Sequence, residues 1–461
     1  MLNDFLSGQT QYFSDAAHTE LRAQKNRTRR VTLLGGDMIQ NTRSDVSGVS
    51  ARVYRNGTYG FSSMAETTPE AARAVLAAAT ENAAFMDAHV GRGAPPIPPL
   101  PSETVPAPAP FDDAEQRTYI DFARALDDRL SRKYKNLAAR RIVVHEDSME
   151  KLLYVSTGTS GHTLAPRSYC YLFFTAETPA GAPVELFSVA GGEGAFPANF
   201  RDPSDMDALA DELYERVMQK RDGVYADAGE KTVVLGGMMT GMLAHEAVGH
   251  TVEADLVLGG SVAAHCLGRP VASEKVSMTD FANTAFGQRC PLPVFLDDEG
   301  TAAKDAPLIE NGILTGYMTS RDLARHYGMP ATGNARAWLF SDEPLIRMRN
   351  TCILPGKNTL EELIASVDDG YYLIDSGNGQ ADLTGEFMFG VTCGYEIKHG
   401  KLGRALLDTT VSGVAFDMLK TVDMVSDTVE WSSSGFCGKK QMIPVGMGGP
   451  CMRCRIMIGG R

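Results

Sequence analysis

The strongest fold signal in the chain is VSARVYRNGTYGF, residues 49–61. Apolar Val49, Ala51 and Val53 alternate with polar residues, which is typical of a strand with one buried face. Asn56-Gly57 follows, and this pair favours the type I′ turn that joins two antiparallel strands. The stretch therefore predicts a β-hairpin.

A helix is predicted directly after this hairpin. Thr68-Pro69-Glu70 supplies an N-cap, a first-turn proline and a first-turn acid, and an alanine-rich run continues toward Phe85. The run LIENGIL, residues 308–314, contains a second Asn-Gly turn. Hairpins without regular strand–helix alternation favour α+β architecture over a doubly wound sheet. We expect a multi-domain α+β protein with largely antiparallel sheets and packed helices.

Prolines divide the chain. They cluster between residues 93 and 110, where missing N–H groups and fixed φ angles favour an extended, semi-rigid linker. A softer break lies before residue 226. We therefore predict an N-terminal α+β domain at 1–92, which contains the hairpin and the alanine-rich helix. The proline-rich linker at 93–110, a middle α+β domain at 111–225 and a C-terminal domain at 226–461 follow.

The charge balance limits the choice of partner. Asp and Glu number 57 against 44 Lys and Arg, so the formal net charge is −13. We expect such a polyanion to bind neither nucleic acid nor a membrane surface. The N-terminal residues lack the basic and apolar segments of a signal peptide. These features predict a soluble, cytoplasmic protein whose eight cysteines are mostly reduced.

Several polar segments are expected at the surface. Asp297–Gly300 predicts a polar turn, and Thr332–Arg336 predicts a surface turn. Cys451 and Cys454 are expected to be exposed thiols. We interpret a cluster of basic residues as the solvated face of a helix: Arg22, Lys25, Arg27, Arg29 and Arg30.

The most informative segment is HEAVGH, residues 245–250. Two histidines with a glutamate beside the first are typical of zinc-hydrolase helices, where imidazoles bind the metal and the carboxylate activates water. Here His245 and His250 are five residues apart, which places them about 140° apart around a regular helix. A π-bulge would return both rings to one face, and Gly249 has no Cβ to crowd such a distorted turn. This metal-site helix would open the C-terminal domain.

A zinc site needs a third protein ligand and an open position for water. Glu253 and Asp255 follow the motif closely and offer carboxylates. Cys437 offers a thiolate in a glycine-flanked loop that can approach a metal. The residues alone leave these alternatives open.

The chain contains further short motifs in addition to HEAVGH, at residues 296–301, 308–318, 332–334, 354–357, 437–439 and 443–446. With them, the chain resembles the TldD/PmbA family, in its TldD-like, metal-binding branch. The resemblance implies a zinc metallopeptidase that acts on unfolded or short peptides, with one Zn²⁺ per chain. It implies that His245, His250 and Cys437 bind the metal and that Glu246 is the general base. It also implies a homodimer or a heterodimer with a related chain.

Two other functions remain in view. A dipeptidyl-peptidase-III-like hydrolase has similar histidine spacing and would use a carboxylate such as Glu253 as third ligand. Alternatively, the chain is a non-catalytic peptide-binding subunit of a TldD/PmbA-type complex. The intact His245, Glu246 and His250 favour an enzyme.

Overall fold

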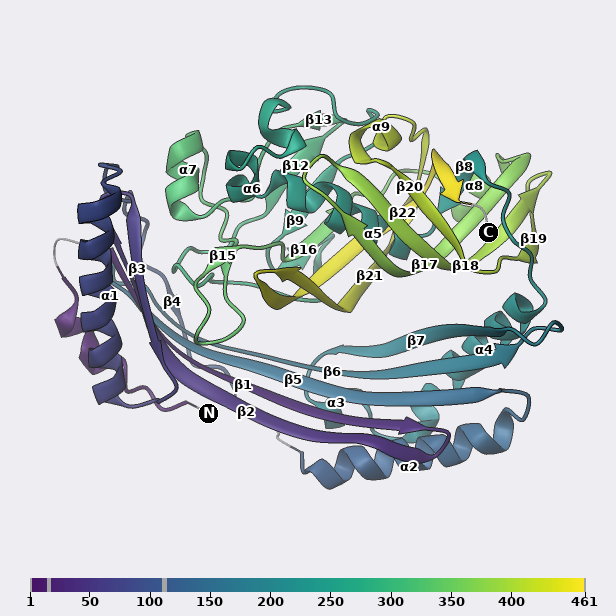
Figure 1. Cartoon of the computed structure of the whole chain (residues 1–461), viewed down its shortest axis with the longest axis horizontal. Helices are drawn as coiled ribbons and strands as arrows, with labels where there is room; N and C mark the ends of the chain where they lie inside the picture. The colour runs from purple at the N-terminus through teal and green to yellow at the C-terminus, as the bar shows by residue number, and fades with distance from the viewer. Residues whose placement is uncertain (1, 15–17, 110–113, 460–461) are drawn as a thin grey trace.

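The computed structural model describes residues 2–14, 18–109 and 114–459. Figure 1 shows a long curved sheet, with the C-terminal half of the chain lying along its concave side. The protein is multi-domain and α+β, and its strands pair mostly antiparallel, as predicted. Within the described residues, no helix has the length and apolar character needed to cross a membrane.

The first sheet combines the beginning and the middle of the chain. Its order is β3-β2-β1-β5-β6-β4, and β7 pairs with β6. The predicted hairpin is confirmed, because Asn56-Gly57 joins β2 to β3 with φ angles of 48° and 92°. The strands are β1 (His18–Leu34), β2 (Asp37–Arg55), β3 (Thr58–Met64), β4 (Thr104–Val105), β5 (Ala139–Val155), β6 (Ser160–Glu177) and β7 (Pro183–Glu193).

Strand β1 pairs with β2 on one side and with β5 on the other. Strands from the predicted segments 1–92 and 111–225 therefore share one sheet. The proposed domain limits stay predictions, and residues 110–113, where the linker meets the middle segment, lie outside the described residues.

Helices cover the convex face of this sheet (Figure 1). Helix α1 (Pro69–Val90) is capped by Thr68, whose side chain accepts a hydrogen bond from the Ala71 N–H at 3.1 Å. A Cβ at Gly60 would lie 2.2 Å from the Ala79 carbonyl oxygen, so glycine lets α1 approach the sheet. Helices α2 (Gln116–Lys133), α3 (Phe196–Asn199) and α4 (Asp207–Arg221) pack over the other end.

The helix prediction for the basic cluster is wrong. All five residues lie in β1, and Arg22 and Arg29 are buried. Leu21 and Ala23 face the helices on one side of the strand, while Arg22 faces the C-terminal half on the other. Because both faces of β1 are covered, its polar face does not mark a solvated helix.

The second sheet forms the C-terminal half. Its order is β13-β12-β9-β16-β22-β20-β18-β17-β8, with β19 on β18 and β21 on β22. The strands are β8 (Gly229–Leu235), β9 (Met278–Phe281), β12 (Ala306–Glu310), β13 (Ile313–Leu314), β16 (Asn350–Ile353), β17 (Asp369–Ala381), β18 (Glu386–Lys398), β19 (Lys401–Ala405), β20 (Thr409–Val414), β21 (Met424–Lys439) and β22 (Gln441–Gly459).

Short elements complete this half. Two small hairpins pair β10 (Thr284–Ala285) with β11 (Gln288–Arg289) and β14 (Ala335–Arg336) with β15 (Leu345–Ile346). The helices are α5 (Gly237–Leu243), α6 (Ala254–Leu258), α7 (Arg321–Tyr327), α8 (Leu360–Ala365) and α9 (Ala415–Leu419).

The described part of the proline-rich linker has no regular secondary structure except for the short strand β4. Arg321 Nη2 donates a hydrogen bond to the Pro98 carbonyl at 2.8 Å, and Arg325 Nη1 donates to the Pro95 carbonyl. Helix α7 therefore holds the linker against the C-terminal half.

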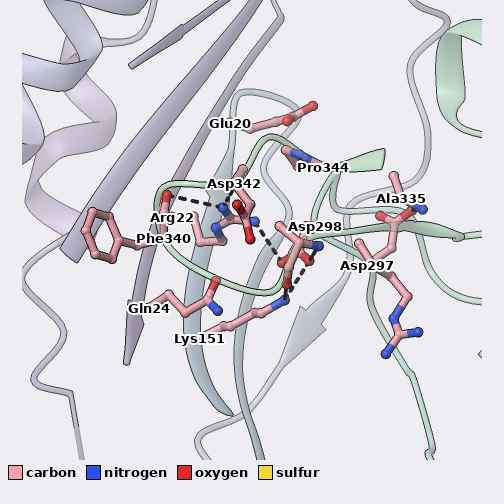
Figure 2. A network of polar contacts seen from close by, with 12 residues as sticks. Glu20, Arg22, Gln24, Lys151, Asp297, Asp298, Ala335, Phe340, Asp342 and Pro344 are labelled. Atoms are coloured by element: carbon pink, nitrogen blue, oxygen red, sulfur yellow. Dashed lines mark hydrogen bonds and ion pairs between the residues drawn. The ribbon is translucent and has the colours of Figure 1, made fainter. Parts of the chain in front are cut away.

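A buried network of charges joins the two halves, and its members come from β1, β2, β5 and the turn Asp297–Gly300. Figure 2 shows Arg22 and Lys151 pointing toward Asp298, at 3.4 and 2.6 Å. Beside them, Arg52 lies 2.8 Å from Glu20 and 2.6 Å from Glu299. The turn was predicted correctly but is buried, because its carboxylates meet the cations of the first sheet.

Candidate metal centre

The HEAVGH segment distorts its helix as the spacing predicts. Helix α5 continues into a π-helical segment at Ala244–Gly249, and a short 3₁₀ turn, His250–Val252, follows. The His245 and His250 ring centroids are 5.3 Å apart, with the rings at 78° to each other. The extra residue therefore brings both rings to one side of the segment.

Gly249 serves packing here. Its φ is an ordinary helical −52°, so the turn needs no special backbone conformation at this position. A Cβ on Gly249 would lie 2.1 Å from the Met348 sulfur and 3.1 Å from the Ala244 carbonyl oxygen. Glycine therefore lets the segment lie directly against Met348.

Cys437 reaches the histidines from β21. Its Sγ lies 3.2 Å from His250 Nε2. One ligand atom each from His245, His250 and Cys437 lies within 4.8 Å of the other two. His245 and Cys437 are buried, and His250 is half-buried. Two imidazole nitrogens and a sulfur thus converge from parts of the chain 187 residues apart.

The cluster fits a zinc ion on two grounds. Neither ring nitrogen of buried His245 has a hydrogen-bond partner among the described residues, and an unpaired buried polar atom is costly. Zinc favours nitrogen and thiolate ligands, and catalytic sites use three protein ligands with one open position. The donor set and the unsatisfied nitrogens therefore match this metal.

Electrostatics favour a thiolate. Burial raises the pKa of the Cys437 thiol, but His245 and His250 lower it more, so the pKa is about 5. Burial lowers the pKa of His250, while Cys437 and Glu253 raise it to about 10. Both directions favour a negatively charged sulfur beside a positively charged ring, the charge pattern that suits a site for a metal cation.

The nearby carboxylates lie in different places. Glu246 Oε2 is 3.8 Å from His250 Nε2, and its side chain is 27% exposed. Glu253 lies on the opposite side of the His250 ring, with Oε2 2.9 Å from Nδ1. Asp255 Oδ1 accepts a hydrogen bond from Lys439 Nζ at 2.8 Å. Glu246 therefore faces the same side of His250 as Cys437, and Glu253 does not.

Two supports of Cys437 have no signal in the sequence. Buried Arg347 donates from Nη2 to the Cys437 carbonyl at 2.6 Å and from Nη1 to the Gln441 carbonyl at 2.8 Å. From the first sheet, the Tyr169 hydroxyl donates to the Ser433 carbonyl at 2.8 Å. These bonds go to backbone oxygens, so no side-chain motif announces them.

Two further surface predictions are wrong. Cys451 and Cys454 are buried in β22, where burial raises the pKa of both thiols, to about 12 for Cys454. Asn334 of the predicted surface turn is fully buried and donates to Asp280 Oδ2 at 2.8 Å. Cys451 and Cys454 belong to two different hydrophobic clusters, so both faces of β22 are covered, and Asn334 lies in a loop that packs against Asp280.

Comparison with known proteins agrees with this architecture. Residues 228–460 match the PmbA/TldA metallopeptidase C-terminal domain, and residues 19–83 match PmbA/TldA metallopeptidase domain 1. A protein named metalloprotease from Methanothermobacter thermautotrophicus is 30% identical over 452 residues, covering 96% of this chain and 95% of its own. The chain therefore belongs to the TldD/PmbA family.

Other relatives are similar in part or in fold. A zinc metalloprotease TldD homolog from Saccharolobus solfataricus is 34% identical over 261 residues, 56% of this chain and 58% of that protein. The crystal structure of TldE from Thermococcus kodakarensis has a TM-score of 0.74 at 18% identity, covering 99% of both chains. A putative modulator of a DNA gyrase from Thermotoga maritima gives 0.73 at 17%, covering 98% of both.

Proposed function

We propose that this protein is a zinc-dependent peptidase that hydrolyses unfolded or short peptides. The observation that carries the proposal is the convergence of His245, His250 and Cys437, with the His245 nitrogens unsatisfied. These three residues would hold one zinc ion per chain. The metalloprotease names of the relatives support the same function.

When bound, zinc supplies Lewis acidity and lowers the pKa of a water molecule. Glu246 is the carboxylate placed to use that effect, because it borders His250 Nε2 and remains partly exposed. We assign it to accept a proton from the attacking water and to deliver it to the leaving amine. Cys437 Sγ and Glu246 Oε2 both lie on the Nε2 side of the His250 ring, so the carboxylate borders the proposed ligand atoms.

The alternative with a carboxylate third ligand has less support. Glu253 already contacts His250 Nδ1, and it also accepts a hydrogen bond from Lys439 at 3.2 Å. The alternative of a non-catalytic binding subunit requires a chain that binds peptides without cutting them. The experiment below separates it from the enzyme.

The test compares the wild-type protein with Glu246→Gln and with the control Glu274→Gln. Glu274 is an exposed glutamate paired with Lys275, away from the cluster. Metal content should remain stoichiometric in all three, while peptide cleavage should fall by roughly 10²–10⁴-fold in Glu246→Gln alone. Wild-type cleavage rates in Glu246→Gln would refute the assigned role.

We also propose a cytoplasmic protein that works as a homodimer or as a heterodimer with a related TldD/PmbA-family chain, without nucleic acid or membrane partners. The support for this assembly is membership of the TldD/PmbA family, whose resemblance implies pairing with a related chain. Light scattering of the chain alone and mixed with such a relative measures the assembly. A monomer under both conditions would contradict it.

A further inference from the structure

A buried carboxylate stands behind the proposed metal ligands. The Glu253 side chain is fully buried, and its Oε2 is shared between His250 Nδ1 at 2.9 Å and Lys439 Nζ at 3.2 Å. Its second oxygen, Oε1, has no hydrogen-bond partner among the described residues. Removing a carboxylate from water costs several kcal/mol, so its position at this ring needs an explanation.

The two nitrogens of His250 face different partners. Nε2 lies 3.2 Å from Cys437 Sγ, and Nδ1 lies against Glu253. An Nδ1–H that donates to a carboxylate leaves Nε2, on the side of Cys437, as the nitrogen that can bind a metal once its own proton is released. The same bond fixes the rotation of the ring. Glu253 therefore prepares His250 as a metal ligand.

Lys439 connects this carboxylate to the hairpin that carries Cys437, two residues earlier. Its Nζ donates to Glu253, to Asp255 at 2.8 Å and to the Ile346 carbonyl at 3.0 Å. Cys437, Lys439, Glu253 and His250 thus form a closed ring of backbone and side-chain contacts. The ring fastens β21 to the segment that follows the histidines.

A purely structural ion pair does not explain this closed set of contacts among Cys437, Lys439, Glu253 and His250. Asp255 is 32% exposed and already pairs with Lys439 at 2.7 Å, so the lysine needs no second, buried carboxylate. Glu253 adds the contact with His250 that Asp255 lacks. The cost of burying it is explained by the orientation of the imidazole.

We propose that Glu253 and Lys439 are positioning residues of the metal centre, which hold His250 and Cys437 in place before the metal binds. The inference rests on the proposed zinc site. It does not require that the protein cut peptides.

The test measures zinc affinity of the full-length protein by competition with a chromogenic chelator. Glu253→Gln keeps the size of the side chain and removes its charge, and Lys439→Met removes the cation. Each should weaken zinc binding by about 10–100-fold, the range for residues that support a metal-bound histidine. Lys439→Arg restores the charge and should recover most of the affinity.

The controls change neighbouring groups of the same type. Asp255→Asn alters a carboxylate that contacts Lys439 but not His250, and Lys440→Met removes an exposed lysine next in sequence. Both should bind zinc as the wild type does. Thermal unfolding of the metal-free variants checks folding, and the absorption bands of bound Co²⁺ report whether nitrogen and sulfur ligands remain.

The outcomes separate this inference from the proposed function. Equal zinc affinity in Glu253→Gln, Lys439→Met and the wild type would overturn the positioning role. An equal loss in Asp255→Asn would also overturn it, because a general effect of charge would then explain the data. If the wild type binds zinc with this dependence but cleaves no peptide, the peptidase proposal fails and the positioning role stands.

Discussion

Two buried polar regions of this protein differ in how far the chain satisfies them. In the network between the halves, Arg52 and Lys151 each contact carboxylates within 3 Å. In the candidate metal centre, both ring nitrogens of His245 lack partners among the described residues. Burial and charge are common to both regions. The network also contains an unpaired buried atom, Arg22 Nε, but Arg22 keeps other partners, whereas neither ring nitrogen of His245 has one among the described residues.

The difference also concerns what each region holds together. The network ties the first sheet to the turn at Asp297–Gly300 (Figure 2), so we expect it to contribute to folding stability. The candidate metal centre joins two segments of the C-terminal half, and we expect substitutions of its residues to change zinc affinity. A mutation in the network that changed zinc affinity, or one in the metal site that changed only stability, would contradict this difference.

The largest expected effect is on stability. Arg52→Met leaves Glu20 and Glu299 buried without their shared cation, and this should lower the free energy of unfolding by about 3–5 kcal/mol. Urea unfolding measures the change. The control Arg55→Met breaks an exposed pair with Asp87 and should cost about 0–1 kcal/mol. Unchanged zinc affinity in both variants would support separate roles for the two regions. A loss of zinc affinity in Arg52→Met would contradict them.

The second effect is on metal binding. Cys437→Ala removes a proposed ligand, and zinc affinity should fall by more than about 100-fold, beyond the range for supporting residues. Each tenfold corresponds to about 1.4 kcal/mol, so the loss is at least about 3 kcal/mol of binding free energy. Chelator competition measures it. Full affinity in this variant would favour a carboxylate as third ligand.

The third effect depends on pH. Burial raises the pKa of Glu20, but Arg52 and His18 lower it to about 2, against 4.5 for the free side chain. Its contribution is therefore complete above pH 4.5 and is lost as pH falls from 4.5 toward 2, up to about 3 kcal/mol. Urea unfolding between pH 7 and pH 3 should show a steeper decline in the wild type than in Glu20→Gln. Parallel curves would contradict the shift.

The smallest effect is expected at the thiols of β22. Cys454→Ala removes a buried sulfur outside the cluster and should cost roughly 1 kcal/mol of stability through the small cavity left behind. Zinc content, measured by elemental analysis, should stay that of the wild type. Loss of metal from this variant would show that the ligand set is wrong.

Local signals made much of the fold predictable. The hairpin at 49–61 depends on a turn pair and an alternating pattern, both of which act over a few residues. The π-helical segment agrees with the spacing of His245 and His250. On a regular helix, a separation of five residues would point the two rings in different directions. From the residues alone, Cys437 was one of several candidate third ligands, and the family resemblance selected it, since no local pattern links it to His250, 187 positions away.

Covered polar faces were the main source of error. Arg22 lies in a strand whose second face is buried by the other half, so its surroundings depend on contacts far along the chain. Arg347 binds backbone carbonyls, which every residue possesses, so no partner motif reveals it. Such features become visible only when the two halves are brought together.

Because the chain is synthesised from its N-terminus, the separation of His250 and Cys437 in sequence is also a delay in time. The sulfur leaves the ribosome 187 residues after the histidine, which takes about 10–40 s at 5–20 residues per second. Strand β22, the partner of β21, follows Cys437 and ends at Gly459. The histidines are therefore made well before their thiolate. A zinc ion held by all three proposed ligands could therefore bind only after Cys437 has been synthesised.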